Sequence, residues 1–250
     1  MDTMEIGEQA LEGGWKVKWS YCEDVESPRS ECNLGHLVTW HPRYRSPDEN
    51  PYRDPEEFRA DMLADLFTHD EMLEAVRGGM FATLRVDSDG QLSELCRAMG
   101  TGKDAWEPVE GYNEWRDAEE LAEALSQRRE CDRLLRTKMV IKTVYMLDHS
   151  GVAYGTSDFG DPWDSGAVGF AYATEDEVSS WFGGIPTSRE KVEGILDEEV
   201  ERLSEWASGE TYMVELEHDG QVVDCVCGCI GDADLEAGIA EMRRQVPSAA

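Results

Sequence analysis

Residues 210–230 read ETYMVELEHDGQVVDCVCGCI, and this stretch decides the fold class. Apolar and polar side chains alternate on both sides of Asp219 and Gly220, a pair of residues typical of the tightest turns between strands. The pattern predicts a β-hairpin whose strands cover residues 210–217 and 221–230. An all-helical fold is thereby excluded.

More strands are expected upstream of this hairpin. Residues 138–147 are rich in β-branched side chains, which suit the pleated surface of a sheet. Shorter extended segments are expected at residues 15–22, 36–44, 152–156 and 168–173.

The first helix has a clear beginning in the sequence. Asp54 can cap it, Pro55 suits its first position, and Glu57 is placed to complete the cap. We expect this helix to continue to Arg77, because two glycines follow there.

Other helices are inserted between the strands. Leucines at helical spacing predict a helix over residues 117–136, and capping boxes at residues 174–177 and 187–190 open two more. A last helix is expected over residues 232–244. Strands in hairpin order with inserted helices predict an α+β fold with a mainly antiparallel sheet and a strongly acidic surface.

The composition changes near Thr137, which suggests two parts. We expect an N-terminal α+β part with two helices over residues 1–136 and an acidic C-terminal α+β part over residues 137–250. The two parts are expected to pack together as one unit.

The net charge limits the possible partners. The 250 residues include 54 Asp and Glu against 23 Lys and Arg, a formal charge of −31. A field of this sign repels polyanions, so direct binding to nucleic acid or to an anionic membrane is not expected. Residues 143–242 hold 23 acids and only three bases, so most of the charge lies in the C-terminal part.

One predicted helix, over residues 187–208, arranges some of these acids in a row. Acidic residues recur at every third or fourth position: Glu190, Glu193, Asp197, Glu201 and Glu205. Side chains at this spacing lie about 5–6 Å apart, and like charges there oppose helix formation. We interpret the row as a partner-binding face that imitates the phosphates of a DNA strand. The alternative interpretation is a solvated face that keeps the protein dissolved.

A second group of polar residues follows the strand at residues 138–147. Asp148, His149, Asp158, Asp161 and Asp164 could supply a general base and oxygen ligands for a divalent cation. This segment is the candidate site for the alternative function, a metal-assisted hydrolase. Asp, Gly, Pro and Ser are also ordinary turn residues, so a purely structural role is the other interpretation.

Three cysteines alternate along the second strand of the hairpin. Cys225, Cys227 and Cys229 would lie about 6.6 Å apart per step on one strand face, too far to share one zinc ion. We therefore expect buried, apolar cysteines, no metal site and no cofactor.

The chain lacks signals for export or membrane insertion. Residues 1–14 contain four acids and no base, unlike a secretory signal, and no apolar run approaches about 20 residues. Seven scattered cysteines suit reduced thiols, so a cytoplasmic location is expected.

Several short motifs occur in an order that resembles a known family. The motifs are ESPR at 26–29, NLG at 33–35, WHPRY at 40–44, DHSG at 148–151, PWDSG at 162–166 and VGF at 168–170. Together with the hairpin at 209–231, they resemble a family of small acidic proteins encoded by bacteriophages and mobile elements. The resemblance implies a mobile-element origin and carries no catalytic residue.

Charge and implied origin together favour one class of function. We expect a protein without catalytic activity that inhibits a host DNA-binding defence complex, of the anti-CRISPR or antirestriction type, in the bacterial cytoplasm. The expected partner is a CRISPR effector or a restriction-modification enzyme, bound through a DNA-mimicking surface. The alternatives are the hydrolase described above and an accessory phage protein without catalysis.

Overall fold

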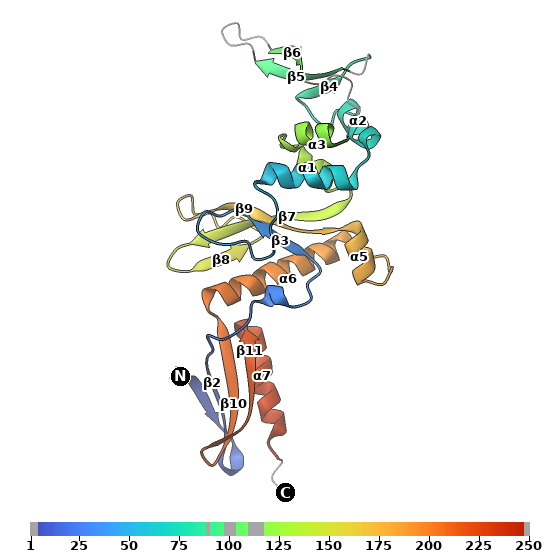
Figure 1. Cartoon of the computed structure of the whole chain (residues 1–250). Helices are drawn as coiled ribbons and strands as arrows, with labels where there is room; N and C mark the ends of the chain where they lie inside the picture. Colours follow the sequence, from blue (N-terminus) through green and yellow to red (C-terminus); the bar gives the residue numbers. More distant parts are fainter. Residues whose placement is uncertain (1–4, 89–90, 98–103, 110–117, 248–250) are drawn as a thin grey trace.

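The computed structural model describes residues 5–88, 91–97, 104–109 and 118–247. They form helices and antiparallel sheets, which confirms the predicted α+β class. Three sheets follow one another along one long axis, with helices between or beside them (Figure 1). The molecule is therefore elongated.

The central sheet divides the molecule. Its strand order is β3 (His36–Thr39), β9 (Ser165–Thr174), β7 (Met139–Asp148) and β8 (Val152–Gly155). Met139 and Ile141 point to one face of this sheet, whereas Val140 and Val144 point to the other. Both faces are therefore buried, and each belongs to a separate hydrophobic core.

The first core lies between the central sheet and the upper end of the molecule. It is built by four helices, α1 (Pro55–Leu66), α2 (His69–Arg77), α3 (Ala118–Ser126) and α4 (Cys131–Leu135). A small sheet of β4 (Leu84–Val86), β5 (Leu92–Arg97) and β6 (Asp104–Pro108) lies above these helices (Figure 1).

The second core lies on the opposite face of the central sheet, between this face and the long helix α6 (Arg189–Ser208). Val192, Leu196, Val200 and Leu203 of this helix are buried there. The short helix α5 (Glu175–Trp181) precedes α6, and its cap is the predicted box of Thr174 and Glu177.

The lower end of the molecule is a third unit built on the predicted hairpin. Its sheet has the order β1 (Glu5–Ala10), β2 (Trp15–Tyr21), β10 (Thr211–His218) and β11 (Gln221–Ile230). Helix α7 (Gly231–Gln245) packs on one face of this sheet. Asp219 and Gly220 form the turn with φ angles of 51° and 83°, as the sequence predicts.

Two predicted helices are each divided in the structure. The segment from Pro55 to Arg77 breaks at Phe67, because Thr68 and Glu71 form a capping box that starts a new helix. The segment predicted over residues 117–136 contains α3 and α4 with a turn between them. The capping box predicted at residues 187–190 is wrong, because Ser188 is the N-cap of α6 and accepts from the Lys191 N–H.

Four strands and two single turns were not predicted. β1, β4, β5 and β6 are short and carry charged residues, so their alternation is weak. The single turns of 3-10 helix are η1 (Glu12–Gly14) and η2 (Pro28–Ser30).

The expected boundary at residues 136 and 137 falls between α4 and β7. Strands from both sides of it share sheets, since β2 pairs with β10 and β3 pairs with β9. In the described part of the chain, none of the helices has the length and apolar composition that crossing a membrane requires.

Candidate functional site

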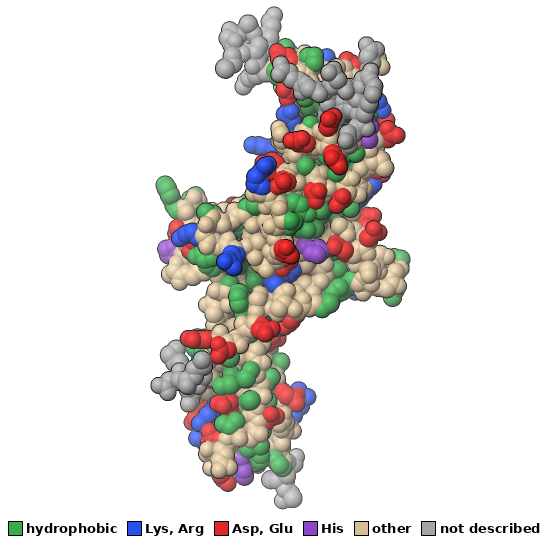
Figure 2. All heavy atoms as spheres, in the orientation of Figure 1, with side chains coloured by type: hydrophobic (Ala, Val, Ile, Leu, Met, Phe, Trp, Pro, Cys, Tyr) green, Lys and Arg blue, Asp and Glu red, His purple; other side chains and the backbone are tan. Residues whose placement is uncertain are grey.

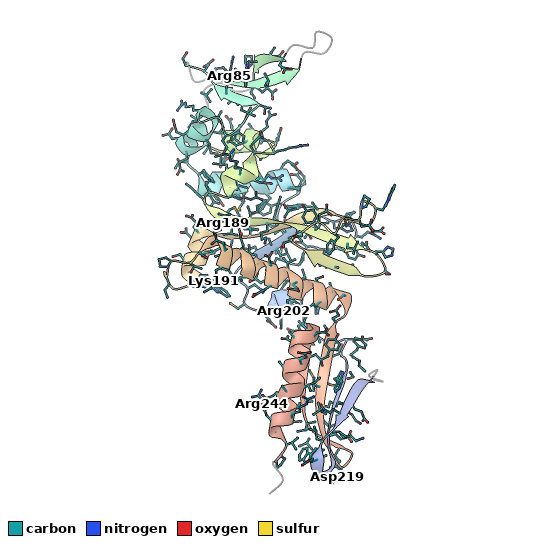
Figure 3. The ribbon with its side chains drawn as sticks, turned by 180° about the vertical axis from the view of Figure 1, so that it is seen from behind. Arg85, Arg189, Lys191, Arg202, Asp219 and Arg244 are labelled. Atoms are coloured by element: carbon teal, nitrogen blue, oxygen red, sulfur yellow. The ribbon has the colours of Figure 1, made fainter. Side chains whose placement is uncertain are left out.

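The predicted acidic row lies on α6, but its members differ in their surroundings. Glu193 accepts from Arg189 Nε at 3.0 Å, and Asp197 forms an ion pair with Lys142 and a hydrogen bond with Thr156. Figure 3 shows Arg189, Lys191 and Arg202 along the same helix. Positive charges thus interrupt the row at the places where it meets the central sheet.

The other three acids of the row are not equivalent either. Glu190 and Glu201 are exposed. Glu205 is partly buried beside Gly231, and burial, followed by the charges of Glu201 and Glu210, raises the pKa of its carboxyl. The structure therefore brings all five residues to one helix, where Glu193 and Asp197 form ion pairs and Glu190 and Glu201 are exposed.

Another acid of α6, Glu199, is held in place by several hydrogen bonds to other parts of the fold. Its carboxylate accepts from the backbone N–H groups of Leu34 and Gly35, with the shortest distance 2.7 Å, and from Arg29 Nη1 at 3.2 Å. Glu199 follows Leu196 by three residues and precedes Leu203 by four, so it occupies the apolar spacing. That position is the sequence signal that could have identified it.

A more continuous acidic surface lies elsewhere, between α1 and α3. These helices lie side by side, and a groove of about 880 Å³ runs along them. Its lining contains six acids and one base: Asp54, Glu56, Glu57, Asp61, Glu119, Glu123 and Arg53. The groove is therefore strongly negative, and the sequence analysis did not single it out.

Both walls of the groove carry acids. Glu56 and Asp61 come from α1, and Glu119 and Glu123 come from α3. All four side chains are exposed, and Figure 2 shows Asp and Glu side chains gathered over these helices. Arg53 donates to the neighbouring Asp54 at 2.7 Å and is 79% exposed, so it balances one charge at the end of the groove.

Tyr52 lines this groove and packs against the first core. Burial and the neighbouring carboxylate of Asp61 raise the pKa of its phenol to about 12. Its ring meets Phe58 edge to face, with centroids 5.3 Å apart. The groove is therefore backed by a fixed aromatic wall.

The second candidate segment lies at the end of the central sheet where β7, β8 and β9 meet. His149 Nδ1 lies 2.7 Å from Asp164 Oδ2, and Asp148 accepts from Arg43 and, at 3.3 Å, from the Tyr44 hydroxyl. The Asp148 N–H also donates to the Asp164 carbonyl. The structure thus brings Asp148, His149 and Asp164 together.

The remaining acids of this segment hold turns. Asp161 accepts from the N–H groups of Trp163 and Asp164, and these bonds lower the pKa of its carboxyl. Asp158 accepts from the Gly160 N–H at 2.9 Å. Among the described residues, no group of three or more His, Cys, Asp or Glu side chains is placed to share a metal ion.

The hydroxyl groups next to this segment are also occupied. Ser150 Oγ donates to the His149 carbonyl at 2.7 Å, and Ser165 Oγ donates to the Asp161 carbonyl at 2.6 Å. Neither hydroxyl is bonded to the imidazole that would have to activate it as a nucleophile. These two hydrogen bonds help to fix the loop that carries Trp163, whose side chain is 91% exposed.

The cysteines of β11 differ from the expectation. Cys229 is buried as predicted, but Cys225 and Cys227 are exposed, so the prediction of three buried cysteines is wrong. The physical reason is a bulge at Gly228, where φ is 83°, which turns Cys229 to the face covered by α7 and leaves the other two on the open face.

Comparison with known proteins adds no assignment. No family model, no curated protein and no solved structure matches the chain.

Proposed function

We propose that the protein inhibits a host DNA-binding defence complex by occupying its DNA site with the acidic groove between α1 and α3. The observation that carries this proposal is the presence of exposed carboxylates on both walls of one groove, with a single arginine among the lining residues. A CRISPR effector or a restriction-modification enzyme is the partner class that the proposal names.

The physical argument rests on the pattern of charge. A DNA duplex presents two phosphate rows that flank a groove, and proteins bind these rows with Lys and Arg. Two neighbouring helices that carry carboxylates on the walls of one groove present two sets of negative charge in a similar way. Because helices are rigid, the carboxylates are fixed before binding, which limits the entropy lost in the complex.

The position of the groove supports the same function. It lies on the upper half of an elongated molecule, away from the sheet of β1, β2, β10 and β11 (Figure 1). Glu190 and Glu201 of α6 are also exposed, but α6 lies on the other side of the central sheet from α1 and α3, and Glu193 and Asp197 are partly neutralised by their ion pairs. In this proposal the α6 row is secondary to the groove.

The proposed mode of inhibition also bears on catalysis, cofactors, location and origin. A protein that blocks a DNA site needs no catalytic residue, no cofactor and no direct contact with nucleic acid. It must meet its target where that target works, which for a defence complex is the bacterial cytoplasm. A phage or mobile-element origin supplies the reason for such an inhibitor.

The test is inhibition of DNA binding by purified defence complexes. A CRISPR effector and a type II restriction enzyme are each mixed with labelled target DNA and increasing amounts of the protein, and bound DNA is measured by fluorescence anisotropy. We expect displacement of DNA from one of these classes, with an inhibition constant that weakens steeply as salt rises. An inhibition constant that does not change with salt concentration would overturn the proposal. So would a ternary complex in which the defence complex binds the protein and its target DNA at the same time.

A further inference from the structure

Three sulfur-containing side chains share the open face of the lower sheet, which is the face that α7 does not cover. Cys227 of β11 lies directly opposite Met213 of β10, and Cys225 lies two residues before Cys227 on the same strand. Val214 and Val226 alternate with them and pack against α7. The two thiols and the thioether therefore point to the same side of the sheet.

The sulfur atoms are also close to one another. Burial, followed by the neighbouring thiols of Cys225 and Cys22 and a hydrogen bond to Cys225, raises the pKa of the Cys227 thiol. The stretch from Cys225 to Cys227 lies between the two bulges of β11, so the regular alternation of the strand holds both thiols on one face. Directly opposite residues of an antiparallel pair have Cβ atoms about 4.5–5.5 Å apart, which places the Met213 thioether within reach of Cys227.

These two thiols are open to solvent. Cys225 and Cys227 are free and exposed, whereas Cys131 and Cys229 are free but buried. Met213 is partly buried beside them. A small ion in solution can therefore reach the two thiols without a change in the fold.

The chemistry of the three sulfur atoms selects the kind of ion. Thiolate and thioether sulfur are soft ligands, and a site that combines them favours Cu(I). Structural zinc takes four ligands in a tetrahedron, and the described residues place no group of three or more His, Cys, Asp or Glu side chains around one point. Cu(I) is satisfied by two or three sulfur ligands, and this face offers that number.

We infer that Cys225 and Cys227 bind one Cu(I) ion on the open face of the lower sheet, with the Met213 thioether as a third ligand. Each thiol loses its proton when it binds, so one Cu(I) ion and two thiols give a bis-thiolate complex of charge −1 and two protons. The copper stays Cu(I) throughout, so the step needs no oxidant or reductant.

The spacing that argues against a zinc ion shared by three cysteines of one strand suits two thiolates on opposite sides of one ion. Alternate residues of a strand are about 6.6 Å apart. Two sulfur atoms that flank one ion are about 4.6 Å apart, twice a metal–sulfur bond of about 2.3 Å. Rotation of both side chains about χ1 brings the sulfur atoms toward each other along the strand and closes this difference.

The electrostatics of the chain and the place of the site are compatible with this assignment. A chain of net charge −31 attracts cations of every kind, so charge supports binding and the sulfur ligands supply the selectivity. The lower sheet lies at the opposite end of the molecule from the groove between α1 and α3 (Figure 1). Cu(I) binding and inhibition of a defence complex can therefore fail independently of each other.

The experiment is an anaerobic titration of the full chain, in excess over copper, against the coloured complex of Cu(I) with bicinchoninate. We expect the protein to take Cu(I) from the dye, to keep it in the presence of excess Zn²⁺, and to release two protons for each ion bound at neutral pH. Retention of the ion by the dye, or loss of the bound ion to Zn²⁺, would overturn the inference.

Two double variants that remove equal numbers of thiols locate the site. Cys225→Ser with Cys227→Ser removes both proposed thiolates, and Cys32→Ser with Cys96→Ser removes two cysteines outside the lower sheet. Loss of even an outer partner of a metal ligand typically costs 10–100-fold in affinity, so we expect the first variant to lose more than about a hundredfold and the second to bind like the parent. Equal loss in the two variants would contradict the site.

Thermal unfolding without and with Cu(I) shows that the variants are folded and gives a second measurement. A ligand that binds only the folded chain raises its Tm. We expect Cu(I) to raise the Tm of the parent and of the Cys32→Ser and Cys96→Ser variant, and to leave the Tm of the Cys225→Ser and Cys227→Ser variant unchanged. A rise of equal size in all three proteins would contradict the inference.

X-ray absorption at the copper edge tests the third ligand. We expect a Cu(I) spectrum with sulfur ligands alone, at about 2.3 Å, and the loss of one sulfur ligand in Met213→Leu, a substitution that nearly conserves volume. Nitrogen or oxygen ligands in the parent would overturn the site, and an unchanged spectrum in Met213→Leu would overturn the role of the thioether.

Discussion

Arg29 and Glu199 lie far apart in the sequence and form a partly buried ion pair, with Arg29 Nη1 3.2 Å from Glu199 Oε2. The same guanidinium binds both carboxylate oxygens of Asp48, at 2.8 and 2.6 Å, and the Gly35 carbonyl at 2.6 Å. Its side chain is 5% exposed. One arginine thus joins the 27–35 loop and the segment after β3 to α6.

Removal of this arginine should destabilise the fold strongly. Arg29→Ala leaves Asp48 and Glu199 without their cation, a loss that typically costs about 3–5 kcal/mol for a buried pair. Arg202→Ala is the control, because Arg202 is 36% exposed and its bond to Asp234 should contribute less than about 1 kcal/mol. Urea denaturation of both variants measures the difference, and equal stability of the two would contradict the account.

The pair of His36 and Glu177 should make stability depend on pH. The bond from Glu177 raises the pKa of His36. Burial opposes ionisation of Glu177, but bonds from His36 and Thr174 outweigh it and lower its pKa to about 2. Glu177 therefore stabilises the fold above its ordinary pKa and loses this effect as the pH falls toward 2. His36 stabilises the fold below its ordinary pKa and loses this effect as the pH rises through the raised value.

The variant His36→Gln tests the histidine part of this dependence. The capping bonds of Glu177 to Thr174 remain in the variant, so the difference from the parent reports the ion pair. Because His36 is about half exposed, we expect a difference below about 1 kcal/mol, present under mildly acidic conditions and lost at alkaline pH. A difference in unfolding free energy that does not change with pH would show that the pair is not ionic.

Two glycines of β9 should respond differently to the same substitution. A Cβ at Gly169 would lie 2.0 Å from the Val38 carbonyl oxygen and 2.8 Å from Thr39 Cα, both backbone atoms of β3. Gly169→Ala should therefore separate β3 from β9 and cost at least about 2 kcal/mol. At Gly166 a Cβ would meet nothing within 4 Å, so Gly166→Ala should be nearly neutral. Thermal unfolding distinguishes the two, and a neutral Gly169→Ala would refute the close packing of these strands.

The acidic row of α6 should contribute less to target binding than the groove. Glu190→Gln with Glu201→Gln removes the two exposed charges of the row without touching an ion pair described for the helix. We expect inhibition of DNA binding to weaken by less than about threefold, as for exposed charges at a rim. A loss of about tenfold or more would place the binding face on α6.

The sequence predicts the parts of this fold that have strong local signals. The hairpin around Asp219, the strand that contains Val140 and Val144, and the box of Thr174 and Glu177 are all confirmed. The break at Phe67 was missed because the box of Thr68 and Glu71 lies inside a longer helical pattern. β1, β4, β5 and β6 were missed because short strands with charged residues show little alternation.

The candidate site was harder to predict because it depends on contacts between residues that are far apart in the sequence. The spacing of the α6 acids follows from the helix itself, but Lys142 lies on β7 and only the fold brings it to Asp197. The groove needs acids from α1 and α3, about 60 residues apart, and no pattern in either helix alone reveals it.

The central claim is that the groove between α1 and α3 occupies the DNA site of a defence complex. The most direct measurement compares two variants with equal changes in charge: Glu56→Gln, Asp61→Asn and Glu123→Gln in the groove, and Glu12→Gln, Glu23→Gln and Glu236→Gln at the lower end. Each is titrated against target DNA bound to the complex that the parent protein inhibits. We predict that the groove variant loses about tenfold or more in inhibition, because three charge contacts of up to about 1 kcal/mol each are removed, while the second variant keeps it. Equal loss in both, or no loss in the groove variant, would contradict the claim.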